Sequence, residues 1–215
     1  MENAMPTETA APPQVLILGI GNVLWADEGF GVRAVEGLHR DYHFPGNVHL
    51  LDGGTQGLYL LEHVQDADIL IVFDAVDYGL PPGTLKLIRD AEVPRFMGAK
   101  KMSLHQAGFE EVLAVAELTN RLPRHLVLIG VQPVELEDYG GSLRRAVKAQ
   151  IAPAIGHALD CLAAFGVHYA PRPVPLPPGA GLTGAELDID DYESRRPDAA
   201  QAFRHGDPRF LKSAD

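Results

Sequence analysis

The sequence predicts a single α/β domain: a twisted, mostly parallel sheet of about five strands, one of them an antiparallel edge strand, with helices on both faces. Short, continuously apolar runs recur along the chain, as expected for parallel strands that are buried on both sides. Segments with apolar residues three or four positions apart separate these runs, which is the spacing of amphipathic helices. Strands that alternate with helices favour a parallel sheet between two helical layers.

The first half of the chain predicts a βαβαβ unit. An apolar run from Val15 to Leu18 precedes a Gly-x-Gly sequence and predicts the first strand, and a helix follows from about Glu28. Residues 47–52 predict a second strand, residues 55–64 a second helix and residues 67–76 the most apolar strand. The apolar positions of the first helix recur at three-residue steps: Val32, Val35 and Leu38.

The second half adds a strand of a different kind. Residues 83–90 alternate apolar and charged side chains after a short Gly/Pro link, which predicts an antiparallel edge strand reached by a hairpin-like return. A helix that contains Phe109 and a strand over residues 125–131 follow. The last predicted helix is long, with an apolar face from Leu143 to Leu162, and Pro153 is expected to kink it.

Composition is that of an ordinary globular protein. With 215 residues, 46% of them hydrophobic and 22% charged, one principal domain with a substantial core is expected. A formal net charge of -11 argues against a nucleic-acid binder, so the expected partner is a protein or a small molecule. The only cysteine, Cys161, fits a buried structural thiol in a cytoplasmic protein, and no apolar run is long enough to span a membrane. A monomer is the default expectation.

Composition also divides the chain into three parts. Residues 1–13 are polar and lack periodicity, which predicts a loose N-terminal arm. Residues 14–169 hold the α/β domain. Residues 170–215 begin with a proline-rich stretch and continue with five acids between residues 186 and 193, which predicts a tail that is disordered or docked on the domain.

Four chemically reactive side chains are expected at one edge of the sheet. Ligands of parallel α/β proteins bind beyond the carboxyl ends of the strands. Glu28 follows the first predicted strand, Asp52 and Asp74 close the second and third, and His105 lies in the predicted loop before the Phe109 helix. Two carboxylates and an imidazole from separate segments can bind a divalent transition metal and leave positions open for water or substrate.

Each of these residues also has a structural explanation. Asp27 is most simply a helix N-cap, and Glu28 can be a first-turn acid favoured by the helix dipole. Asp52 precedes two glycines and can be a turn residue, and His105 can lie on the surface. Asp74 ends an almost wholly apolar strand, where an unpartnered acid is costly, so a functional role is favoured for it.

The two glycines after the first strand do not complete a dinucleotide-binding motif. The motif G-x-G-x-x-G needs a third glycine where this chain has Leu24, and the expected acid lies about 20 residues further on. Asp52 is 28 residues beyond Leu24, and the loop continues through Trp25 before the helix. No P-loop sequence is present either, so neither phosphate-binding pattern is met.

Several motifs together resemble those of the nickel-iron hydrogenase maturation endopeptidases. The resemblance spans roughly Val15 to Val167, and the tail lies beyond it. The chain is similar to a member specific for an uptake-type hydrogenase. The motifs are, in chain order, "ILGIGNVLWADEGFGVRAVEGL", "LLDGGTQGLYLL", "ILIVFDAVD", "GTLKLIRDAEVP", "SLHQAGFEEVL" and "LVLIGVQP".

The resemblance implies a cytoplasmic protease, classified with the aspartyl endopeptidases, that removes the C-terminal extension of a hydrogenase large-subunit precursor after nickel insertion. It implies that Glu28, Asp74 and His105 contact nickel, which the precursor's own metal centre supplies. Nickel would then act as a checkpoint, and it could also polarise the scissile carbonyl or activate water. The "DGGTQG" segment, with Asp52 and residues Gly53, Gly54 and Thr55, is an expected contact for the precursor.

Three other functions remain open at this point. The first is a non-catalytic chaperone that binds the precursor or delivers nickel. The second is a nucleotide-binding domain, which the missing third glycine already disfavours. The third is a general metal-dependent hydrolase that acts on unrelated peptides.

Overall fold

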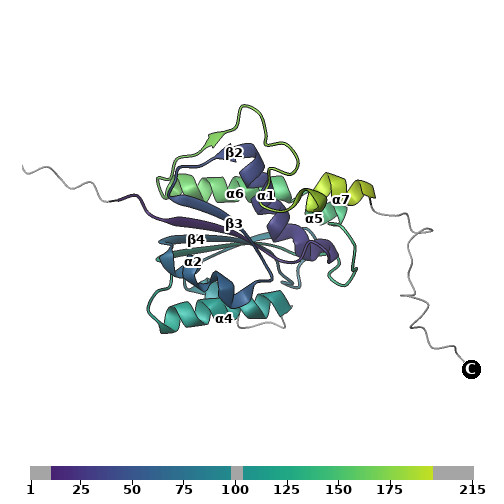
Figure 1. Ribbon diagram of the computed structural model, residues 1–215. Coiled ribbons are helices and arrows are strands. Elements are labelled where there is room, and N and C mark those ends of the chain that lie inside the picture. Colours follow the sequence, from purple (N-terminus) through teal and green to yellow (C-terminus); the bar gives the residue numbers. More distant parts are fainter. Residues whose placement is uncertain (1–10, 98–103, 196–215) are drawn as a thin grey trace, which may run out of the picture.

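A five-stranded sheet forms the centre of the molecule (Figure 1). The computed structural model describes residues 11–97 and 104–195, with side chains described except at 95–97 and 104–107. Most of the predicted N-terminal arm therefore lies outside the described residues. The strand order is β3-β1-β4-β6-β5. The strands are β1 (Val15–Ile20), β3 (Val48–Gly54), β4 (Ile69–Ala75), β5 (Leu85–Arg89) and β6 (His125–Val131).

Pairing within the sheet confirms a mostly parallel arrangement. β1 pairs in parallel with β3 and β4, and β4 pairs in parallel with β6. β5 is the predicted antiparallel edge strand, but it pairs with β6 and not with the preceding strand β4. The link after β4 is therefore no simple hairpin, because β6 enters the sheet between the two strands that the link connects.

Helices cover both faces of the sheet, as predicted. One face packs on α1 and α6, and Ile17, Ile71 and Ile129 point into this core. The other face packs on α2 and α4, and Leu18 and Leu70 point into that second core. Successive strand residues alternate between the two cores, as the two-residue period of a strand requires. The helices are α1 (Phe30–Asp41), α2 (Leu61–Asp66), α3 (Glu92–Met97), α4 (Leu104–Leu118), α5 (Arg145–Lys148) and α6 (Ile151–Ala164).

The long C-terminal helix is divided into α5 and α6, so the prediction of one kinked helix was wrong. Pro153 lies in the first turn of α6, where a proline lacks only an N–H that has no helical partner. An uninterrupted helix would bring the proline ring against the carbonyl of Ala149, four residues earlier. The first helix, α5, therefore ends before Ala149, and a second helix, α6, begins at Ile151.

The described part of the tail lies on α1 and α5. β7 (Ala170–Pro171) pairs with the short strand β2 (Tyr42–His43), and α7 (Ile189–Arg195) follows the 3-10 turn η3 (Ala185–Leu187). Figure 1 shows α7 beside α5, on the side of the sheet that carries α1. Within the described residues, no helix has the length and apolar character needed to cross a membrane.

Two glycine substitutions should have opposite effects on the free energy of unfolding. A Cβ at Gly31 would overlap the carbonyl oxygens of Phe73 and Ile20, because the start of α1 packs directly on the strand ends. We expect Gly31→Ala to destabilise the protein by about 2 kcal/mol or more. Gly156 lies inside α6 with open space around it, so Gly156→Ala should stabilise by up to about 1 kcal/mol. Urea denaturation of both variants checks this, and equal midpoints would contradict it.

Candidate active site

The parallel register brings the predicted acidic residues to one edge of the sheet. Asp74 is the sixth of seven residues of β4, and Asp52 is the fifth of seven residues of β3. Glu28 lies in the 3-10 turn η1 (Ala26–Gly29), which follows β1 and packs against β4. Because β1, β3 and β4 are parallel, all three residues follow or end strands at the carboxyl edge.

Asp74 is a fully buried carboxylate in an otherwise apolar strand. Strand alternation places its side chain on the face shared by Leu70 and Val72, which α4 covers. His105 lies in the first turn of α4 and not in a loop before it, so the predicted helix begins earlier than expected. The side chain of His105 lies outside the described residues. The backbone nevertheless starts α4 on the sheet face toward which Asp74 points.

A tight turn delivers Glu28 to the edge. Gly21 has a φ of +132°, and a Cβ there would overlap the carbonyl oxygen of Glu28. Ala26 has a φ of 41°, a left-handed conformation that costs free energy in any residue but glycine. Glycine at position 21 therefore lets η1 pack directly against the end of β1. The Gly-x-Gly sequence serves this close packing, and α1 starts only at Phe30.

Asp27 is not a helix N-cap, and this prediction was wrong. Its fully buried carboxylate accepts backbone hydrogen bonds from residues more than one hundred positions away. Oδ2 accepts from the N–H groups of Val134 and Glu135 at 2.8 and 2.9 Å, and Oδ1 from that of Arg144 at 2.6 Å. The backbone N–H of Asp27 in turn donates to the carbonyl of Glu135. Asp27 therefore fastens the loop after β6 beside Glu28.

Asp52 lies on the opposite face of the sheet from Asp74. Its neighbours in alternation, Val48 and Leu50, pack in the core that α1 covers. Oδ1 of Asp52 is buried and has no hydrogen-bond partner among the described residues. Burial raises the pKa of this carboxyl; the Gly54 N–H opposes the rise, the charge of Glu36 adds to it and that of Arg33 opposes it. The segment from Asp52 through Gly53, Gly54 and Thr55 therefore ends β3 with a carboxylate that is costly to ionise.

Asp52→Asn should stabilise the protein at neutral pH. A raised pKa means that the folded state disfavours the carboxylate, so the penalty is present at pH 7 and disappears as pH falls through the raised pKa. Asparagine keeps the shape without the charge. Urea denaturation should give a higher midpoint for the variant at pH 7 and a smaller difference at pH 4.5. A variant less stable than wild type at pH 7 would contradict this account.

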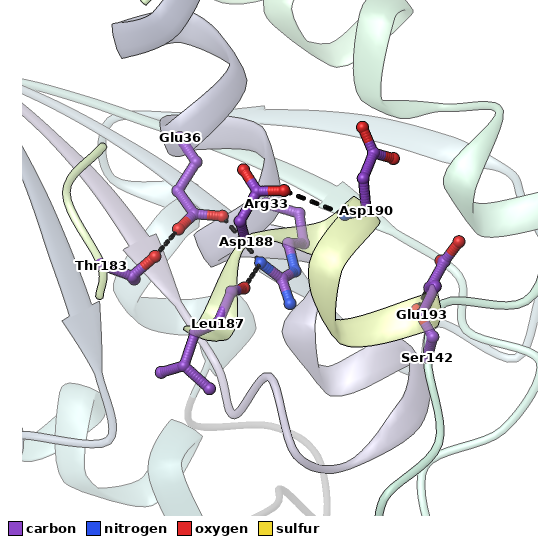
Figure 2. Close-up of polar contacts among 8 residues, drawn as sticks. All are labelled: Arg33, Glu36, Ser142, Thr183, Leu187, Asp188, Asp190 and Glu193. Atoms are coloured by element: carbon purple, nitrogen blue, oxygen red, sulfur yellow. Dashed lines mark hydrogen bonds and ion pairs between the residues drawn. The ribbon is translucent and has the colours of Figure 1, made fainter. Parts of the chain in front are cut away.

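The tail contacts two charged residues that influence Asp52 (Figure 2). Arg33, 5% exposed, donates to Glu36 at 3.0 Å and to the carbonyl oxygen of Leu187 in η3. The hydroxyl of Thr183 donates to the other carboxylate oxygen of Glu36. The tail thus completes the polar environment of a partly buried ion pair on α1.

A second contact holds α7. Glu193 accepts hydrogen bonds from Ser142 and Lys148, both at 2.7 Å. Burial raises the pKa of Glu193, but these two donors outweigh it and the pKa lies below its ordinary value. The contact therefore stabilises the docked tail fully at pH values above the ordinary glutamate pKa. It weakens as the pH falls through the lowered pKa of Glu193.

Sequence reasoning missed two residues next to the site. Tyr78 follows β4, and its hydroxyl lies where a Cβ of Gly130 would be, opposite Asp74 in the strand register. Burial, and then the charge of Asp74, raise the pKa of Tyr78 well above its ordinary value. Gln132 is a buried polar residue directly after β6.

The buried position of Cys161 confirms the structural interpretation of its thiol.

Among the residues whose side chains are described, no three His, Cys, Asp or Glu side chains gather as a metal-binding cluster. That set does not contain His105. The proposed ligand trio therefore stays a prediction, with Glu28 and Asp74 at the same edge of the sheet and His105 on the helix that covers the Asp74 face. Fold and site together define an α/β protein with an acidic site at the carboxyl edge of a parallel sheet.

Comparison with known proteins assigns this fold to a family. Residues 32–161 match the family model described as hydrogenase maturation protease. Hydrogenase expression/formation protein HupM of Azotobacter chroococcum mcd 1 is 61% identical over 203 residues, which cover 94% of this chain and 96% of that protein. Hydrogenase 2 maturation protease of Escherichia coli K12 is 42% identical over 160 residues, 74% of this chain and 96% of that protein. The E. coli protein is therefore shorter than this chain.

A solved structure shows the same fold. The hydrogenase maturating endopeptidase HybD from E. coli superposes with a TM-score of 0.70 at 41% identity, over 74% of this chain and 98% of that chain. The chain belongs to the hydrogenase maturation protease family. It is therefore an endopeptidase of hydrogenase maturation, as its sequence motifs predict.

Proposed function

We propose that this protease removes the C-terminal extension of a nickel-iron hydrogenase large-subunit precursor once nickel has been inserted. The reaction takes place in the cytoplasm, and nickel is part of the substrate. Glu28, Asp74 and His105 are the residues assigned to contact the metal. The family assignment supports the precursor as substrate. Asp52 and the following residues 53–55 are assigned to the precursor's C-terminal segment.

The observation that carries the site assignment is the burial of Asp74. Aspartate is seldom fully buried in an otherwise apolar strand, so this position favours a functional role for Asp74. The side chain of Asp74 points to the sheet face that α4 covers, and the first turn of α4 contains His105. Carboxylate and imidazole donors suit a divalent transition metal such as nickel. A site with open positions would engage nickel only when the precursor presents it.

Incubation of the purified protein with nickel-loaded precursor tests the proposal. Mass spectrometry should show one cut and release of the C-terminal peptide, with many precursor molecules processed per protease molecule. A stable complex without any change in precursor mass would indicate a non-catalytic chaperone. Cleavage of unrelated peptides with added nickel or zinc would indicate a general hydrolase.

A further inference from the structure

Two buried polar side chains tie three loops together at the carboxyl edge. Asp27 joins the loop after β1 to residues 132–144, the loop after β6. Gln132 joins that loop to the one after β4, because its Oε1 accepts from the N–H groups of Tyr78 and Leu80 at 2.7 and 3.1 Å. Its Nε2 donates to Asp77 at 3.0 Å. The three loops are therefore braced as one unit.

The braced loops hold large apolar side chains in solvent. Leu80, Val134 and Tyr139 are 40%, 50% and 67% exposed, and we call these three residues the rim patch. The ring of Tyr139 packs edge-on against that of Trp25 with centroids 5.2 Å apart. The N–H of Gly140 donates to the carbonyl of Leu24 at 2.7 Å. Loops that are fixed by buried hydrogen bonds and still expose apolar side chains are typical of an interaction surface.

The rim patch lies beside the proposed catalytic residues. The loop after β1 carries Glu28, and the loop after β4 begins just beyond Asp74. Because β6 lies beside β4 in the sheet, the loop after β6 is adjacent to the loop after β4. On the far side of β1, the turn η2 (Gly57–Leu60) exposes Leu58 and Tyr59 at 53% and 87%. Exposed apolar side chains therefore flank the site from both directions along the edge.

Charge distinguishes between two possible occupants of this surface. The loop after β6 carries Glu135, Glu137 and Asp138; Asp138 pairs with Arg144, whereas the Glu137 side chain is exposed. A second copy of this chain would bring the same acidic loop and a further net charge of -11 against it. A segment with apolar and basic side chains fits both the chemistry and the charge of the surface.

We propose that the rim patch is the docking surface for the hydrogenase precursor and binds an apolar segment with neighbouring basic residues, close to the peptide bond that is cut. The proposal rests on the proposed function, because that function supplies the partner. It assigns substrate affinity to the rim patch and the chemical step to the residues at the strand ends. Loss of the patch should therefore weaken binding and leave the rate at saturating precursor unchanged.

Single substitutions test this division. Tyr139→Ser and Val134→Ser should each raise the dissociation constant for nickel-loaded precursor about tenfold, as truncation of an interface anchor does. Tyr139 also packs on Trp25, so its replacement could weaken binding by loosening the loop. Val134→Ser tests the patch without removing that ring contact. The matched control is Leu118→Ser, because Leu118 is 82% exposed at the end of α4, away from the carboxyl edge. Binding is measured by calorimetry in an Asp74→Asn background, which keeps the precursor uncut.

Processing rates complete the test. In the otherwise unaltered protease, both patch variants should lose about tenfold in rate at low precursor and recover at saturation. Glu137→Lys should weaken binding, whereas Glu117→Lys, near Leu118, should not. If Tyr139→Ser and Val134→Ser bind precursor with the same dissociation constant as Leu118→Ser, the docking surface is overturned. It is also overturned if sedimentation shows that the patch variants lose only self-association of the protease. Weakened binding together with no cleavage by wild type would retain the docking surface and reject the proposed function.

Discussion

Replacement of Asp74 by asparagine is expected to reduce precursor processing by about a thousandfold or more while the fold remains intact. The substitution keeps the size of a fully buried side chain and removes the charge that the proposed site needs at the end of β4. Loss of a group that acts directly in the chemical step costs about 100-fold to 10,000-fold. The rate at saturating nickel-loaded precursor, measured by mass spectrometry, gives the answer.

Asp68→Asn provides the control for this experiment. Asp68 precedes the same strand at its amino end, is exposed, and accepts a hydrogen bond from the N–H of Gln14 that asparagine can also accept. This variant should process precursor at the wild-type rate. Full activity in Asp74→Asn would remove Asp74 from the catalytic site. Glu28→Gln and His105→Ala are expected to cause losses comparable to that of Asp74→Asn.

Asp27→Ala is expected to cost about 3 kcal/mol or more in the free energy of unfolding. Three backbone N–H groups from the loop after β6 would lose their acceptor in a site that excludes water. Each unsatisfied buried donor costs about 1–3 kcal/mol, and partial relaxation of the loop reduces the sum. Asp27→Asn keeps one acceptor oxygen and should lose less. Urea denaturation measures all three proteins.

Replacement of Asp27 should also impair binding of the precursor, because Asp27 holds the loop that carries Val134 and Tyr139. At a temperature where Asp27→Asn is fully folded, its dissociation constant for precursor should exceed that of wild type. Glu137→Ala, which alters an exposed side chain of the same loop, should keep wild-type stability. An Asp27→Ala protein as stable as wild type would contradict the anchoring role of this carboxylate.

Local sequence patterns predicted the sheet because buried strands and amphipathic helices impose their periods on neighbouring residues. The strand over residues 125–131 has the predicted bounds, and β5 is the predicted edge strand. Strand ends also placed Glu28, Asp52 and Asp74 at the carboxyl edge. Alternation could have shown that Asp52 and Asp74 point to opposite faces, since each strand carries apolar neighbours that define its two sides.

Contacts between distant segments could not be predicted from local pattern. The role of Asp27 depends on N–H groups more than one hundred residues away, and an N-cap and such an anchor have the same local sequence. The docking of the tail depends on single donors and acceptors such as Thr183 and Glu193, which no periodicity reveals. Helix division before Pro153 follows from sterics that a count of apolar positions ignores.

The central claim is that cleavage depends on nickel in the precursor, and one comparison tests it most directly. Wild-type protease is incubated with nickel-loaded and nickel-free forms of the same precursor, and loss of the C-terminal peptide is followed over time by mass spectrometry. The account predicts cleavage of the nickel-loaded precursor and an uncut nickel-free precursor. Equal rates for the two forms would contradict it.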